Sequence, residues 1–223
     1  MRLTSLREIP RYILSVLLLA AMVLPAFGAQ AFPESQRPVP RPETGQFPVL
    51  VTDDDGPASG ATVRIWDGSA TLQGVTDERG ICSFPTVRSD VPLTFRISPR
   101  QGEGVRLEDV RIAPDMPSSV SVQFVEKRVG ADFTVRLGSN PSTGYSWKIT
   151  DQGKQPEIAR LEGNFFSEPQ RPGARRVAGR GGSDVWVFSA AQRGYTVLTF
   201  EYARSWEKGV LPLRSHFVVI RVR

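Results

Sequence analysis

The residue types that most often carry out chemistry are scarce in this chain of 223 residues, which contains one Cys and one His. Cys82 lies in a short apolar run, and His216 lies in a β-type run near the C-terminus. A thiol nucleophile needs a neighbouring base, and a usual zinc site needs several Cys, His or carboxylate ligands. The sequence also has no GxSxG, HExxH or phosphate-loop pattern. We therefore expect no enzymatic activity, no cofactor and no bound metal ion, and we expect His216 to be a structural strand residue.

Two other features have both a structural and a chemical interpretation. A single cysteine excludes an internal disulfide, so Cys82 is either a buried inert thiol, which we favour, or the site of an intermolecular disulfide. Three consecutive Asp residues, Asp53 to Asp55, precede Gly56 and Pro57. They lack the alternating ligand positions and the later bidentate Glu of a dedicated calcium loop. We therefore expect these Asp residues to form a turn.

Three segments rich in turn residues contain the remaining candidate site. They are Asn140-Pro141-Ser142-Thr143-Gly144-Tyr145, Gly179-Arg180-Gly181-Gly182 and Arg204-Ser205-Trp206. Pro141 fixes φ, and Gly144 permits a turn conformation that a side chain would oppose. Trp206 is a large, rigid apolar side chain of the type that is enriched at interface hot spots. These properties suit a protein-binding surface better than a catalytic site.

Short β-type runs must position these segments, because no stretch after Phe47 has a sustained apolar period of 3.6 residues. Evenly spaced runs with turn residues between them predict an all-β protein made of two β-sandwich domains. The expected strands are Phe47–Thr52, Ala61–Trp66, Leu72–Thr76, Ile81–Phe84, Leu93–Ser98, Val105–Ile112, Ser119–Val125, Phe133–Leu137, Tyr145–Thr150, Val185–Phe188, Tyr195–Tyr202 and Phe217–Val222. We expect residues 151–178 to be irregular.

The N-terminal 31 residues have the pattern of a signal peptide. Arg2, Arg7 and Arg11 precede an apolar stretch, and Ala29-Gln30-Ala31 is a small-residue cleavage site. An uncleaved N-terminal anchor is the alternative. Residues 32–46 are rich in proline and predict an extended linker. We therefore expect an exported protein, periplasmic or extracellular, with no membrane attachment after cleavage.

The charge of the exported chain does not indicate a nucleic-acid partner. Residues 1–31 contain three Arg and one Glu, so their removal would lower the formal net charge from +5 to +3. No basic stripe interleaved with aromatic residues accompanies this small excess. The excess of positive charge is no larger than expected for the surface of a soluble domain.

Residues 47–125 resemble a known accessory fold. Asp55–Val63, followed by Gly74–Gly80 and Phe84, is similar to the carboxypeptidase regulatory-like (transthyretin-related) β-sandwich. In that family the module is usually structural or adhesive. The resemblance therefore implies a fold for this domain and no activity.

The three turn-rich segments, taken together and in order, resemble the chagasin-like inhibitors. In that family the corresponding connections read NPTTG(Y/F), GxGG and RPW, and the resemblance covers residues 129–223. It implies that residues 126–223 form an immunoglobulin-like domain that reversibly inhibits papain-like cysteine peptidases, with Thr143 near the catalytic cysteine of the enzyme. Ser205 replaces the usual Pro, which removes a φ restraint and predicts weaker binding. Ser142 for Thr is a milder change.

An immunoglobulin-like fold would place these segments at its B–C, D–E and F–G connections, which can meet at one end of the sandwich. Each motif alone is a common turn, and packing of Trp206 on its own domain is the structural alternative for that residue. The alternative function is a secreted adhesion or structural module built from two sandwiches. Such a module has no reason to keep the ordered set of three connections, so we favour inhibition.

Overall fold

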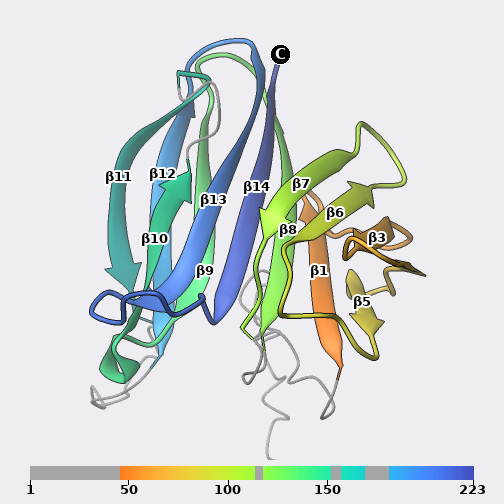
Figure 1. The fold of residues 1–223 in the computed structure, drawn as a ribbon. Coiled ribbons are helices and arrows are strands. Elements are labelled where there is room, and N and C mark those ends of the chain that lie inside the picture. The colour runs from red at the N-terminus through yellow and green to blue at the C-terminus, as the bar shows by residue number, and fades with distance from the viewer. Residues whose placement is uncertain (1–45, 114–117, 152–156, 169–180) are drawn as a thin grey trace, which may run out of the picture. The chain divides into compact units, whose positions relative to one another are not determined.

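The computed structural model describes residues 46–113, 118–151, 157–168 and 181–223 (Figure 1). Within these ranges the prediction of an all-β protein is confirmed, because the regular elements are fourteen β-strands and one short 3-10 turn, η2 (Pro141–Thr143). None of the described residues belongs to a helix with the length and apolar character needed to cross a membrane. The predicted signal peptide and residues 32–45 of the predicted linker lie outside the described residues.

The strands form three sheets. A four-stranded sheet has the order β4-β3-β6-β7, with bounds Thr62–Trp66 for β3, Thr71–Val75 for β4, Leu93–Ser98 for β6 and Val105–Val110 for β7. A three-stranded sheet has the order β11-β12-β9, with bounds Asp132–Ser139 for β9, Ala159–Ser167 for β11 and Gly182–Ala190 for β12.

The third sheet connects the N-terminal and C-terminal halves of the described chain. Its order is β10-β13-β14-β8-β1-β2, and β5 also pairs with β1. The strand bounds are Phe47–Asp53 for β1, Gly56–Pro57 for β2, Ile81–Phe84 for β5, Ser119–Lys127 for β8, Tyr145–Asp151 for β10, Gly194–Arg204 for β13 and Arg214–Val222 for β14.

Strand β8 is shared by the two halves. It pairs in parallel with β1 on one side, where Val49 lies opposite Val120, and in parallel with β14 on the other, where Phe217 lies opposite Val122. Backbone hydrogen bonds therefore run without interruption from the N-terminal strands into the C-terminal ones. The boundary that the sequence suggests between residues 125 and 126 falls inside this strand, and it stays a prediction.

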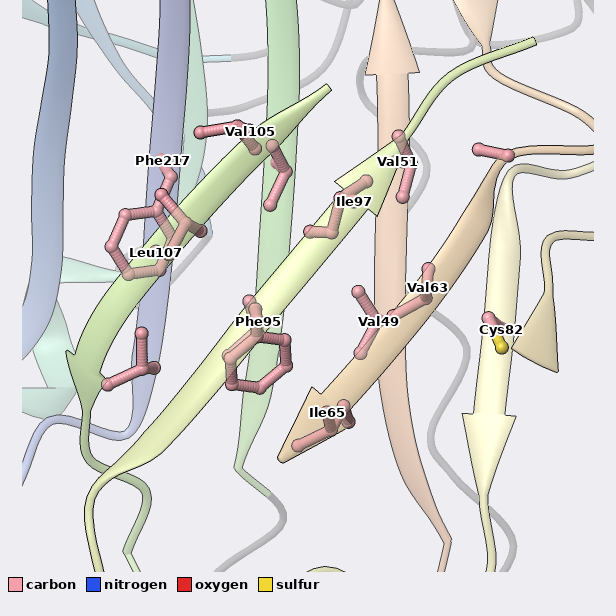
Figure 2. Close-up of a cluster of buried hydrophobic side chains, with 14 of the residues drawn as sticks. Val49, Val51, Val63, Ile65, Cys82, Phe95, Ile97, Val105, Leu107 and Phe217 are labelled. Carbon is pink, nitrogen blue, oxygen red and sulfur yellow. The ribbon is translucent and has the colours of Figure 1, made fainter. Parts of the chain in front are cut away.

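Strand β14 contributes to two hydrophobic cores through its two faces. Phe217 and Val219 belong to the cluster that fills the N-terminal half, whereas Val218 and Ile220 belong to the cluster of the C-terminal half. Alternation of side chains along a strand explains this division. Figure 2 shows Phe217 among the side chains of the N-terminal cluster. Each half therefore depends on the same strand for its core.

The acidic run and the single cysteine have the structural roles that we favoured. The carboxylate of Asp53 accepts a hydrogen bond from the backbone N–H of Asp55 at 3.0 Å. The carboxylate of Asp54 accepts from the backbone N–H of Glu126 at 2.8 Å and from Nζ of Lys127 at 2.6 Å. The Cys82 thiol is buried and free, and its burial raises its pKa. This environment suits an inert thiol.

The prediction that residues 151–178 are irregular is wrong for part of that range, because β11 (Ala159–Ser167) pairs with β12 in an antiparallel ladder. Strand β11 lies at the edge of its sheet and most of its side chains are exposed. It therefore has no alternating apolar pattern, which is the signal that identifies a half-buried strand. Residues 152–156 and 169–178 lie outside the described residues.

Candidate functional site

The connection between β9 and β10 is a tightly hydrogen-bonded turn. Asn140 caps η2: its side-chain Oδ1 accepts hydrogen bonds from the N–H and the hydroxyl of Ser142, at 3.3 and 2.7 Å. Its backbone carbonyl accepts from the N–H and the hydroxyl of Thr143, at 3.1 and 2.7 Å. Such side-chain bonds to neighbouring residues are why Asn favours turns. Pro141, Ser142 and Thr143 are all exposed, so a rigid turn presents them to solvent.

Gly144 ends this turn in a conformation that requires glycine. Its φ is +79°, in the left-handed region, as the sequence suggests for this position. The structure adds a second reason: the ring of Trp206 lies directly over Gly144, and a Cβ atom there would collide with it. The first and third turn-rich segments are therefore in contact.

Trp206 nevertheless remains largely open to solvent. Its side chain is 63% exposed, the highest value among the large exposed hydrophobic residues of the described chain. One part of the ring rests on Gly144, and the rest is available to a partner. Trp206 is thus held in position by its own domain without being buried in it, which combines the two interpretations that the sequence left open.

Arg204 joins the same two segments through its guanidinium group. Its Nε donates a hydrogen bond to the backbone carbonyl of Thr143 at 3.3 Å, and the guanidinium lies 4.5 Å from the centre of the Tyr145 ring. Its other end donates to the Glu207 carboxylate at 2.9 Å. The hydrogen bond to Glu207 raises the pKa of Arg204, so the group stays charged. Through these contacts Arg204 orients the first segment.

The second segment reaches the same end of the domain through its last two residues. Gly182 pairs with Ser139, which precedes Asn140, and the position of a Cβ at Gly181 would be 3.3 Å from the Ser139 carbonyl. A Cβ at Gly182 would collide with Phe166 and with the backbone of Ser167. Glycine therefore permits close approach of three strand ends here. Gly179 and Arg180, the other two predicted residues of this segment, lie outside the described residues.

Three further residues support this end of the domain and were not identified as site residues from the sequence. Tyr202 is buried in the core and supports the turn. Its hydroxyl accepts a hydrogen bond from the Asn140 N–H at 3.0 Å, and its ring stacks on Tyr145 with the ring centres 5.3 Å apart. Glu207 holds Arg204, and Phe166 covers Gly182. Oppositely charged side chains three positions apart are neighbours on a helix, but residues 204–207 form a turn at the end of β13, so no sequence signal pointed to these three residues.

The groups gathered here suit binding and not catalysis. The described part of this end of the domain presents a turn of small polar residues, glycine backbone and one exposed indole ring, and its arginine is already paired with Glu207. The only histidine is buried on β14, where its Nδ1 lies 2.7 Å from the hydroxyl of Ser121. Among the described residues, no group of three or more His, Cys, Asp or Glu side chains could hold a metal ion. We call the described residues of the three segments the binding tip: Asn140 to Tyr145, Gly181, Gly182 and Arg204 to Trp206.

Comparison with known proteins connects this geometry to a family. The family described as "Chagasin family peptidase inhibitor I42" matches residues 126–220. Amoebiasin-2 from Entamoeba histolytica is 33% identical over 89 residues, which make up 39% of this chain and 68% of that protein. No family match identifies the strands before residue 126, so their resemblance to the carboxypeptidase regulatory-like fold stays a prediction.

Two solved structures are also similar to the chain. The cysteine protease inhibitor EhICP2 from Entamoeba histolytica is 23% identical, with a TM-score of 0.37, and the match covers 50% of this chain and 100% of that one. The structure of PbICP-C in complex with falcipain-2 is 15% identical, with a TM-score of 0.31, and the match covers 51% of this chain and 95% of that one.

Proposed function

Because the chain belongs to the chagasin family of peptidase inhibitors, we propose that it binds papain-like cysteine peptidases reversibly and blocks their active-site cleft with the binding tip. The chain is a peptidase inhibitor and not an enzyme. The specific proposal concerns the class of peptidase, the residues that enter the cleft and the way in which the inhibitor avoids cleavage.

The observation that supports this proposal best is the contact between the first and third segments. Arg204 and Trp206 hold the Asn140–Tyr145 turn from one side, and Tyr202 holds it from beneath. Ordering a flexible loop at an interface costs about 0.5–1.5 kcal/mol for each immobilised side chain. A turn that is already ordered avoids much of this cost. The binding tip is therefore suited to enter a narrow cleft without rearrangement.

The same contacts explain how a segment in an active site could resist cleavage. A peptidase cleaves a segment that lies extended in its cleft, whereas this turn is closed by hydrogen bonds between Asn140 and Thr143 and between Pro141 and Gly144. The carbonyl of Thr143 is also bound by Arg204. Opening the turn would break these bonds together. We infer that Thr143 approaches the catalytic cysteine without presenting a bond for attack.

Titration of papain with the purified protein tests the function. We expect inhibition at sub-micromolar concentration, recovery of activity on dilution, and an intact inhibitor by mass spectrometry after overnight incubation. A serine peptidase such as trypsin is the control for general interference. Full papain activity at micromolar inhibitor, or steady cleavage within residues 140–145, would exclude the proposal.

The first mutational prediction concerns Trp206. Trp206→Ala is expected to weaken papain inhibition by about 2 kcal/mol or more, as is typical of aromatic residues at the centre of an interface. Trp66→Ala is the matched control, because Trp66 is also exposed, at 49%, but lies on β3. The inhibition constants of both variants decide the matter. Equal constants for Trp206→Ala and the unmodified protein, with the fold intact, would mean that Trp206 does not contact the enzyme.

The second mutational prediction concerns Arg204. Arg204→Gln removes the hydrogen bond to Thr143 and the contact with Tyr145, each worth roughly 0.5–1.5 kcal/mol. We expect the inhibition constant to rise about tenfold while the melting temperature changes by only a few degrees. Lys208→Gln, a loss of charge in the same connection, is the control. If both variants weaken inhibition equally, Arg204 acts through its charge and not by holding the turn.

We also propose a location and a role for the rest of the chain. The signal-peptide pattern of residues 1–31 supports export to the periplasm or the extracellular space. The resemblance of residues 47–125 to carboxypeptidase regulatory-like sandwiches supports an accessory role for the N-terminal strands. N-terminal sequencing of the exported protein tests cleavage, which we expect after Ala31.

A further inference from the structure

The four-stranded N-terminal sheet carries a row of arginines on the face that points away from its core. Figure 2 shows that Val63, Ile65, Phe95, Ile97, Val105 and Leu107 point into the N-terminal cluster. Their neighbours along the strands must point the other way, because side chains alternate. Arg64 on β3 lies opposite Arg96 on β6, and Arg96 lies opposite Arg106 on β7. All three arginines are exposed.

This row is unfavourable for the protein on its own. Side chains directly opposite on neighbouring strands are about 5 Å apart at Cβ, and like charges in that position destabilise a sheet. Arg64 donates to Gln73 at 2.8 Å, and Arg106 pairs with Glu108 at 2.9 Å. Among the described residues, the central Arg96 has neither a hydrogen bond nor an ion pair. Arg96 thus lies between two other positive charges, and a bound anion would offset the repulsion among the three.

An aromatic residue lies beside the arginine row on the same face. Trp66 follows Arg64 by two residues on β3, so both side chains point outward. Trp66 lies opposite Thr71 on β4 and Thr94 on β6. Its ring is half exposed and has a hydroxyl-bearing residue on each side. An open aromatic face with hydroxyl groups at its borders is well suited to a sugar ring, which has an apolar C–H face and hydroxyls at its edge.

We propose that this outer face binds an acidic polysaccharide, one whose sugar units bear carboxylates. The planar guanidinium of Arg matches a carboxylate through two parallel hydrogen bonds. A sugar unit would stack on Trp66 and bond to Thr71 and Thr94, while the carboxylates of the chain meet Arg64, Arg96 and Arg106. The binding tip takes no part in this contact.

Other anionic partners fit the same face less well. Sequence-independent binding of single-stranded nucleic acid uses several aromatic side chains on which successive bases stack, and this face has one. Insertion into a membrane surface needs a broad apolar face beside the basic residues, and the neighbours of Trp66 are threonines. These partners are therefore the alternatives that the test must distinguish.

The test uses the full exported chain with polygalacturonate as the probe and uncharged dextran as its control. We expect binding to polygalacturonate by isothermal titration calorimetry at low ionic strength, weaker binding at 0.5 M NaCl, and none to dextran. Arg96→Gln and Trp66→Ala should each weaken binding about tenfold, whereas Arg193→Gln, in an exposed turn, and Trp206→Ala should not. Tighter binding to oligo-dT or to anionic lipid vesicles than to polygalacturonate would overturn the proposal, as would equal binding by all four variants.

Stability separates a local effect from misfolding. Because Arg96 repels its neighbours, Arg96→Gln should leave the melting temperature unchanged or raise it, and papain inhibition should stay the same. Loss of polysaccharide binding with these properties retained supports the proposed face. Loss accompanied by a lower melting temperature would count against it, because the row would then be stabilising the sheet.

Discussion

A chain that begins at Ser118, and so lacks β1 to β7, is expected to lose about 4 kcal/mol or more of unfolding free energy. The shortened chain still contains every strand of the chagasin-family match and all of the binding tip. It leaves four buried apolar side chains without their core: Val120, Val122, Phe217 and Val219. Burial of one such side chain contributes about 1.5–3 kcal/mol, and a whole domain is stable by only about 5–15 kcal/mol. Urea unfolding of the shortened and the full chain measures the difference.

A second shortened chain is the control for this prediction. The shortened chain would also expose the apolar face that β1 to β7 cover, together with the edge of β8, and such a surface favours aggregation. Replacing the same four residues with Thr should raise its solubility, because only Phe124 and Val197 would then remain as apolar side chains of that face. If the unmodified shortened chain unfolds at the same urea concentration as the full chain, the N-terminal strands do not support the inhibitor. In that case the shared strand is only a connection.

Acidification is expected to destabilise the protein through His216 before most carboxylates titrate. Burial lowers the pKa of His216 from 6.5 to about 4. The folded protein therefore keeps this ring neutral below pH 6.5, whereas the unfolded chain takes up a proton there, so stability falls as the pH drops from about 6.5 to about 4. A difference of this size corresponds to about 3 kcal/mol. Urea unfolding at pH 7, 5.5 and 4 measures it.

The surroundings of His216 explain the direction of this effect. Its ring bonds to the Ser121 hydroxyl and lies near the rings of Trp147 and Phe200, none of which stabilises a positive charge as a carboxylate would. Its Nε2 is buried and has no hydrogen-bond partner in the described part of the chain. Asp67, whose pKa is lowered to about 2 by hydrogen bonds from the Ala70 and Ser69 backbone, affects stability only at lower pH.

His216→Gln is the control for the acid effect. It keeps a group that can bond to Ser121 but does not titrate, so its stability should change much less between pH 6.5 and 4. The variant is expected to be less stable than the unmodified protein at pH 7, because Gln fills the space beside two aromatic rings poorly. Identical pH profiles for the two proteins would show that other groups cause the loss.

Local patterns in the sequence predicted most of the strands and the turn of the binding tip that contains Pro141 and Gly144. Alternation in Phe133 to Leu137, and turn residues such as Pro141 and Gly144, carry their signal within a few positions of the chain. Strand β11 was missed because an exposed edge strand needs no apolar alternation. The sequence predicted that the segments with Trp206 and Gly144 meet at one end of the domain. It could not predict the contact between the two residues, because their approach depends on the whole fold.

The sheet that the two halves share could not be predicted from local sequence patterns for a similar reason. Nothing in Ser119–Lys127 indicates that β8 pairs in parallel with both β1 and β14. Parallel neighbours are joined through long connections, so their pairing leaves no local signal. The sequence therefore predicts the strands but not the shared strand β8, and the boundary between residues 125 and 126 stays a prediction.

The position of β14 has a consequence for how the chain folds. Residues that meet across β8 and β14, such as Ser121 and His216, are 95 positions apart. Contacts between such distant residues are formed slowly, because a long loop must close first. Since β14 supplies side chains to both clusters, neither core is complete until the last strand has been made. We therefore expect that neither half of a growing chain reaches its native packing before β14 has been made.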